Sequence, residues 1–192
     1  MPDTANKVKF GLKNVYMAAA TIAADGTATY TSPVAVPGAV SLSMDPTGSI
    51  EKFWADNMAY YVYNSEVGYS GDLEMAYIPA SVLTTFLGYK TDADGMLYED
   101  SDAEPPHFAL LFQFEGDQKG VRHCIYNCTA NRMTVGSQTT EGSNEPRTET
   151  LSLEATPIYV AAVSANVTKS RCEEGDDNYS AWFTSVHQPA AE

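Results

Sequence analysis

The chain has 192 residues, a length suited to one domain that buries roughly 70% of the surface of its unfolded form. Its 25 acidic side chains against 11 lysines and arginines give a formal net charge of -14, which argues against a surface that grips nucleic-acid phosphates. The sequence has no apolar run long enough for a membrane span and no signal-peptide pattern at its start. Its three cysteines, an odd number, therefore indicate reduced thiols and synthesis in the cytosol.

The first part of the chain is expected to form antiparallel strands, because apolar side chains recur at every second residue between closely spaced turn signals. In the segment 58–65 the tyrosines fall on both faces, which is typical of a strand that contacts a partner. The predicted strands are residues 7–12, a hairpin of 15–23 with 27–32 around Asp25 and Gly26, then 40–44 and 58–65, with residues 45–57 as a loop.

The next strand, residues 71–78, carries two carboxylates on one exposed face, because Asp72 and Glu74 alternate with apolar residues. Residues 79–88 follow with a proline at the start, apolar residues at helical spacing and a glycine at the end. This pattern predicts the one helix of the chain.

The second half is predicted to return to antiparallel strands. Residues 90–106 form an acidic loop with a hairpin turn at 92–95, and the loop 134–146 separates the later strands. The strand 108–114 is apolar on both faces, as a central strand would be, and it is paired with 121–133 and followed by 147–156. The coarse result is mainly β: an antiparallel β-sandwich or barrel with one short helix.

After residue 157 the apolar density falls, except in the segments 159–163 and 179–183. Trp182 and Phe183 are uncommon in a free tail, so the pattern favours a docking arm over a frayed end. The chain therefore divides into a β-sandwich domain, residues 1–157, and a C-terminal arm, residues 158–192.

Metal binding is not favoured by the residues that invite it. Cys124 and Cys128, with His123, are four residues apart on a strand, which separates them by roughly 13 Å, so buried core thiols are the better interpretation. Residues 92–95 resemble part of an EF-hand, but Lys90 and Ser101 occupy the positions where that loop needs carboxylates. We predict no metal and no cofactor.

An enzyme is not favoured either. Asp72 and Glu74 could serve as the two carboxylates of a glycosidase, but residues two apart on a strand usually form only a solvated face. The histidines at 107, 123 and 187 lie beside no nucleophile motif, and no phosphate loop or dinucleotide fingerprint is present. Cys172 lies among carboxylates that should raise its pKa and weaken it as a nucleophile.

Segments along nearly the whole chain carry a resemblance to a known family. They are residues 6–15 (NKVKFGLKNV), 37–46 (PGAVSLSMDP), 53–61 (FWADNMAYY), 68–74 (GYSGDLE), 108–112 (FALLF), 122–123 with 126–130 (RH and YNCTA), 146–151 (PRTETL) and 179–183 (YSAWF). In combination they resemble a major tail protein, or tail tube protein, of long, non-contractile-tailed phages, often labelled phi13-type. The chain departs from that pattern at Cys124, Cys128 and the acidic residues 172–177.

The resemblance implies a β-sandwich subunit of the phage tail tube and type VI secretion tube type, which assembles into stacked hexameric rings that conduct DNA during ejection. It implies a homo-oligomer in the virion, assembled in the cytoplasm of the bacterial host, with tape measure, tail-end and completion proteins as partners. DNA would pass without specific binding, and no membrane insertion is expected. On this basis Asp72 and Glu74 are expected to face the lumen, because carboxylates repel phosphate. The residues expected at ring or stacking contacts are Phe53, Trp54, Tyr60, Tyr61, Tyr63, Trp182 and Phe183.

Three alternatives remain open at the level of sequence. Another ring-forming tail component, such as a tail-end or completion protein, would share the sandwich and differ mainly in its loops and arms. A monomeric carbohydrate-binding β-sandwich module is suggested by the 12 tyrosines and two tryptophans. A glycosidase would need a cleft with carboxylates from two strands.

Overall fold

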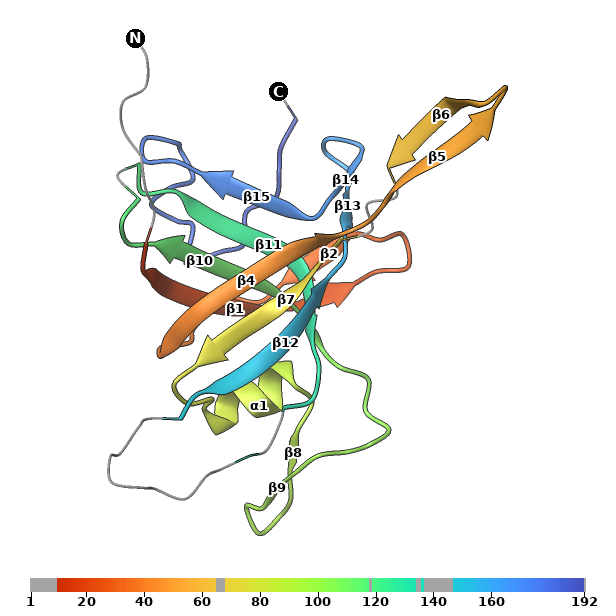
Figure 1. The fold of residues 1–192 in the computed structure, drawn as a ribbon. Coiled ribbons are helices and arrows are strands. Elements are labelled where there is room, and N and C mark those ends of the chain that lie inside the picture. The colour runs from red at the N-terminus through yellow and green to blue at the C-terminus, as the bar shows by residue number, and fades with distance from the viewer. Residues whose placement is uncertain (1–9, 65–67, 118, 134–135, 137–146, 192) are drawn as a thin grey trace, which may run out of the picture.

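The computed structural model describes residues 10–64, 68–117, 119–133, 136 and 147–191. These residues form a mainly antiparallel β structure with one short helix, as the sequence predicted (Figure 1). Residues 7–9 of the first predicted strand and most of the predicted loop 134–146 lie outside the described residues.

One sheet of nine strands organises the fold, and all of its neighbouring strands are antiparallel. Its order is β2-β1-β10-β11-β12-β7-β4, with β15 also paired to β11 and β3 to β1. The strands are β1 (Leu12–Ile22), β2 (Ala28–Tyr30), β3 (Val34–Ala35), β4 (Ala39–Thr47), β7 (Gly68–Met75), β10 (His107–Phe114), β11 (Arg122–Ala130), β12 (Glu149–Ala155) and β15 (Lys169–Cys172).

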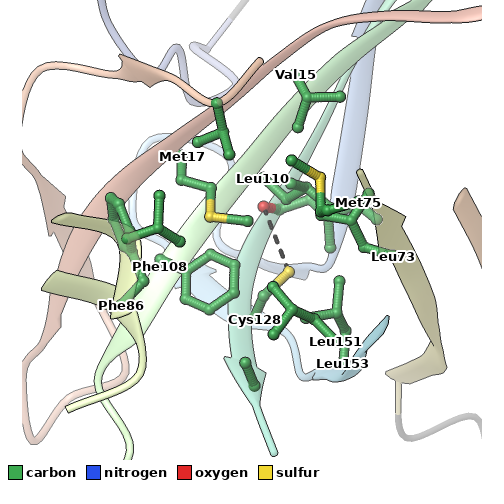
Figure 2. Close-up of a cluster of buried hydrophobic side chains, with 14 of the residues drawn as sticks. Val15, Met17, Leu73, Met75, Phe86, Phe108, Leu110, Cys128, Leu151 and Leu153 are labelled. Atoms are coloured by element: carbon green, nitrogen blue, oxygen red, sulfur yellow. Dashed lines mark hydrogen bonds between the residues drawn. The ribbon is translucent and has the colours of Figure 1, made fainter. Parts of the chain in front are cut away.

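The main core lies inside the curl of this sheet. Figure 2 shows Met17 and Phe108, from β1 and β10, packed with residues of β7 and β12 on the other side of the core. Leu151 and Leu153 of β12 alternate with exposed residues and point inward, as the period-2 pattern predicted. The curl therefore buries one face of each outer strand and leaves the other face in water.

Strand β10 is buried on both faces, which confirms the central strand expected from its sequence. Phe108 and Leu110 point into the main core, whereas Ala109 and Leu111 point into a second apolar cluster on the opposite side. That second cluster is covered by the C-terminal part of the chain.

The helix α1 (Ala80–Phe86) packs against the main core and confirms the helix predicted from Pro79 to Gly88. Val82 and Phe86 are buried, and the Phe86 ring meets the Phe108 ring edge to face with centroids 5.6 Å apart. Of the helices described in this structure, none is long and apolar enough to cross a membrane.

The structure corrects the prediction for residues 45–57, which were expected to form a loop. Strand β4 continues to Thr47, and residues 50–55 form β5 (Ile50–Ala55), paired with β6 (Met58–Asn64). Pro46 is accommodated in β4 because this strand lies at the edge of the sheet, where a missing N–H breaks no ladder. The remaining short pairs are β8 (Lys90–Thr91) with β9 (Leu97–Tyr98), which confirms the hairpin turn at 92–95, and β13 (Ile158–Val160) with β14 (Ala165–Val167).

The three cysteines are buried, which confirms Cys124 and Cys128 as core thiols. Figure 2 shows Cys128 in the main core, where its thiol donates to the Ile125 carbonyl with a sulfur–oxygen distance of 4.0 Å. Burial raises the pKa of Cys128 to about 12. The pKa of Cys172 is raised to about 11, as expected in direction, but burial is the larger cause and the Asp176 carboxylate only adds to it.

Candidate interaction surfaces

The outward face of β4, β7 and β12 is acidic and carries only short polar side chains; we call it the acidic face. Register across the three strands places Asp72 between Ser43 and Ser152, and Glu74 between Ser41 and Thr150. A third row completes the set of nine residues: Ser41, Ser43, Asp45, Ser70, Asp72, Glu74, Thr150, Ser152 and Glu154. Four of these are carboxylates, five are hydroxyls, and none is basic or apolar.

Hydroxyl groups hold the two central carboxylates of the acidic face. Ser152 donates to Asp72, with 2.7 Å between the oxygens. Thr148 and Ser41 donate to the two oxygens of Glu74 at 2.6 and 2.8 Å. These bonds, that of Thr148 first, hold the pKa of Glu74 below its ordinary value, so the face keeps this charge at neutral pH. The shared strand face of Asp72 and Glu74 is confirmed, whereas a lumen around it stays a prediction.

The second surface is the hairpin of β5 and β6, residues 50–64, which we call the aromatic hairpin. Figure 1 shows it extending away from the main sheet beyond the end of β4. Its large apolar side chains are between 48% and 69% exposed: Ile50, Phe53, Trp54, Met58, Tyr60, Tyr61, Val62 and Tyr63. An isolated two-stranded hairpin is marginal in water, and an apolar surface of this kind usually marks an interaction site.

The turn and a bulge determine how the rings of the aromatic hairpin are arranged. Asp56 and Asn57 both have positive φ, 52° and 59°, as a two-residue primed turn requires. Phe53 lies opposite Tyr61, and a register shift after Phe53 leaves Tyr60 in a bulge. The rings of Tyr61 and Tyr63 stack with centroids 6.1 Å apart. Phe53, Tyr61 and Tyr63 therefore share one face of the hairpin.

The predicted C-terminal arm docks on the body of its own chain. Strand β15 joins the main sheet beside β11, and Trp182 is only 4% exposed within the second apolar cluster. Phe183 stacks on Tyr16 with ring centroids 4.8 Å apart. Both rings thus make contacts inside the protomer, and their use against another subunit stays a prediction, as does the division of the chain at residue 157.

Arg122 of β11 holds this C-terminal segment, a role that its sequence position did not suggest. Its guanidinium lies 3.7 Å from the ring centroid of Tyr179 and 4.8 Å from that of Phe183, and it donates to the Tyr179 carbonyl. The Tyr179 hydroxyl in turn donates to the Gly120 carbonyl at 2.9 Å. The only signal in the sequence was the concentration of aromatic residues at 179–183, because Arg122 lies far from them along the chain.

We expect Arg122→Ala to destabilise the protein by about 2 kcal/mol, because two cation–π contacts and a charge-assisted hydrogen bond are lost. Denaturant unfolding measures the change, and limited proteolysis should show faster cleavage after residue 172. Arg171→Ala is the matched control, because that side chain is 69% exposed and its oxygen partner on Glu173 lies 3.9 Å away. Equal effects of the two variants would contradict a specific role for Arg122.

Comparisons with known proteins give two similar solved structures. One is a chain of the "Cryo-EM structure of the anti-feeding prophage (AFP) baseplate, 6-fold symmetrised", at 14% identity and a TM-score of 0.49, covering 88% of this chain and 97% of that chain. The other is a chain of the anti-feeding prophage cap (AFP tube terminating cap), at 11% identity and a TM-score of 0.48, covering 89% and 95%. No family model and no curated protein matches the sequence. A function for this chain therefore has to come from its own residues and surfaces.

Proposed function

We propose that this protein is a structural component of a phage tail, a tube subunit that self-assembles into hexameric rings stacked around a DNA-conducting lumen. The observation that carries the proposal is the aromatic hairpin, whose large apolar side chains are 48% to 69% exposed. Such a surface is costly for an isolated subunit and becomes favourable when another subunit covers it. The resemblance of the sequence to major tail proteins indicates what that other subunit is, namely a further copy in the tube.

The acidic face supports a lumen through which DNA moves without being held. A conduit for DNA needs weak contacts, and carboxylates repel the phosphates. The face carries Asp72, Glu74, Asp45 and Glu154 with no basic residue among its nine positions. Its side chains are short and none is aromatic, so no base-stacking platform is offered to the nucleic acid.

Edge strands support closure of a ring. Strand β4 pairs with β7 on one side and ends the sheet on the other. An unpaired edge can add a strand from a neighbouring copy, and a head-to-tail contact of this kind closes into a ring when its rotation divides a full turn. This role needs no catalytic group, so we propose no enzymatic activity. The further partners would be tape measure, tail-end and completion proteins, and the location would be the virion.

The proposal is tested by negative-stain microscopy of the purified protein over a concentration series, with light scattering for mass. Hollow tubes or stacked rings would support a tube subunit. Assemblies that stop at one or two rings would instead support a tail-end or completion protein. A map of the assembled particle then tests the lumen: Asp72 and Glu74 at a subunit contact would refute the position proposed for the acidic face.

A monomeric carbohydrate-binding module is the second candidate, because exposed rings such as Trp54 and Tyr60 also suit sugar faces. A monomer at every concentration that binds glycans, with loss of binding in Trp54→Ala, would favour it over a tail component.

A further inference from the structure

An open pocket of about 330 Å³ lies between edge strand β4 and the strands β10, β11 and β15. One wall is aromatic: Phe112 stacks on His123 with centroids 5.1 Å apart, and Phe114 meets His123 edge to face at 5.4 Å. Leu42 and Met44 of β4 line it as well, and both are only partly buried. The pocket is thus apolar, open to solvent and of the size that accepts one aromatic side chain.

A single positive charge lies at this pocket. Lys169 of β15 is exposed, and its ammonium nitrogen lies 4.5 Å from the ring centroid of Tyr69, which also lines the pocket. Among the described residues it forms no ion pair with a carboxylate. An aromatic group accompanied by an acidic one would therefore match both the wall and the charge of the pocket.

The same chain carries such a combination on the aromatic hairpin. Phe53 shares a face with Tyr61, and Glu51 lies two residues before it on that face, opposite Tyr63. Residues two apart on a strand are separated by about 7 Å, so a ring in the pocket leaves the carboxylate within reach of its edge. The hairpin extends away from the body in Figure 1 and lines no part of its own pocket.

From these two uncovered and complementary surfaces we infer that Phe53 of one subunit enters the pocket of the next, where Glu51 pairs with Lys169. This deepens the proposed function, on which it rests, by naming the contact between copies. Phe53 fits this position better than Trp54, because a phenyl ring has no N–H that would need an acceptor inside an apolar wall. A knob and a pocket on different parts of one chain form a head-to-tail contact that repeats.

The first experiment separates knob from pocket. Phe53→Ala removes the ring and keeps the pocket, whereas Leu42→Trp fills the pocket and keeps the ring; each should weaken association roughly 30-fold or more, the size typical of an aromatic hot spot. When the two variants are mixed, the contact can form once per pair. Sedimentation should then show assemblies of twice the mass of either variant's own, and no longer ones. Val62→Ala, an exposed residue on the opposite face of the hairpin, should associate like the unaltered protein.

The second experiment does not depend on whether Leu42→Trp folds well. Glu51→Lys and Lys169→Glu should each weaken association, and the double variant should restore it, with a dependence on salt that is reversed by neither change alone. Tubes that form normally in all of these variants would overturn the inference and leave the tube function standing. Oligomers that respond as expected but never form hollow tubes would support the contact and refute the tube. An unaltered protein that stays monomeric at every concentration would overturn the inference.

Discussion

Replacing Phe53 and Trp54 together by alanine is expected to leave soluble subunits or rings and to abolish long tubes. Both rings lie on the aromatic hairpin, and they are 59% and 64% exposed in the single chain. Buried aromatic residues dominate the energy of interfaces, commonly by about 2 kcal/mol or more each, whereas these two contribute little to the fold of an isolated subunit. Negative-stain microscopy and light scattering measure the length and mass of the assemblies.

The control for this prediction is a pair of equally exposed apolar residues elsewhere. Met96 and Tyr98 lie at the β8–β9 hairpin and are 62% and 41% exposed, so Met96→Ala with Tyr98→Ala removes comparable surface. Denaturant unfolding should give the same free energy for both double variants, because neither pair is in a core. Tubes of normal length from the Phe53 and Trp54 variant would refute a role for these rings in assembly.

Gly71→Ala is expected to unfold or severely destabilise the protein, by about 3 kcal/mol or more. Gly71 lies in β7 opposite Met44 of β4, where the strands approach so closely that an added Cβ would lie 1.8 Å from the Ser43 carbonyl oxygen. The obstructing atoms belong to the backbone, so no side chain can rotate away. Strand β4 would have to move, with loss of its hydrogen bonds to β7 and of the burial of Leu42.

Denaturant unfolding measures this effect, and Gly136→Ala is the matched control. A Cβ at Gly136 would meet nothing within 4 Å, so the same chemical change should alter the free energy of unfolding by less than about 0.5 kcal/mol. A Gly71→Ala protein as stable as the unaltered chain would show that β4 is not held at this spacing in solution.

Much of the fold could be predicted because it is local. The period-2 pattern at 149–155 determines which side chains of β12 point inward, and Leu151 and Leu153 are buried. The apolar residues at helical spacing between Pro79 and Gly88 produce α1, and the turn residues at 92–95 produce the β8–β9 hairpin. The burial of Cys124 and Cys128 also followed from their place on a strand that is apolar on both faces.

Other features could not be predicted because they depend on contacts between distant segments. Residues 50–55 were expected to form a loop, yet they pair with β6 once a primed turn at Asp56 and Asn57 brings the two segments together. The role of Arg122 depends on Tyr179 and Phe183, which reach it only through the docking of the C-terminal segment.

The sequence by itself determined that the protein is acidic and mainly β, with one helix, and that Asp72 and Glu74 share an exposed strand face. Only the tertiary structure decided that serines of β4 and β12 flank these carboxylates, that Trp182 is buried in its own chain and that the aromatic hairpin is left uncovered. The physical reason is that alternation along one strand specifies which face is buried, whereas the neighbours of that strand are selected by packing between residues far apart in the chain.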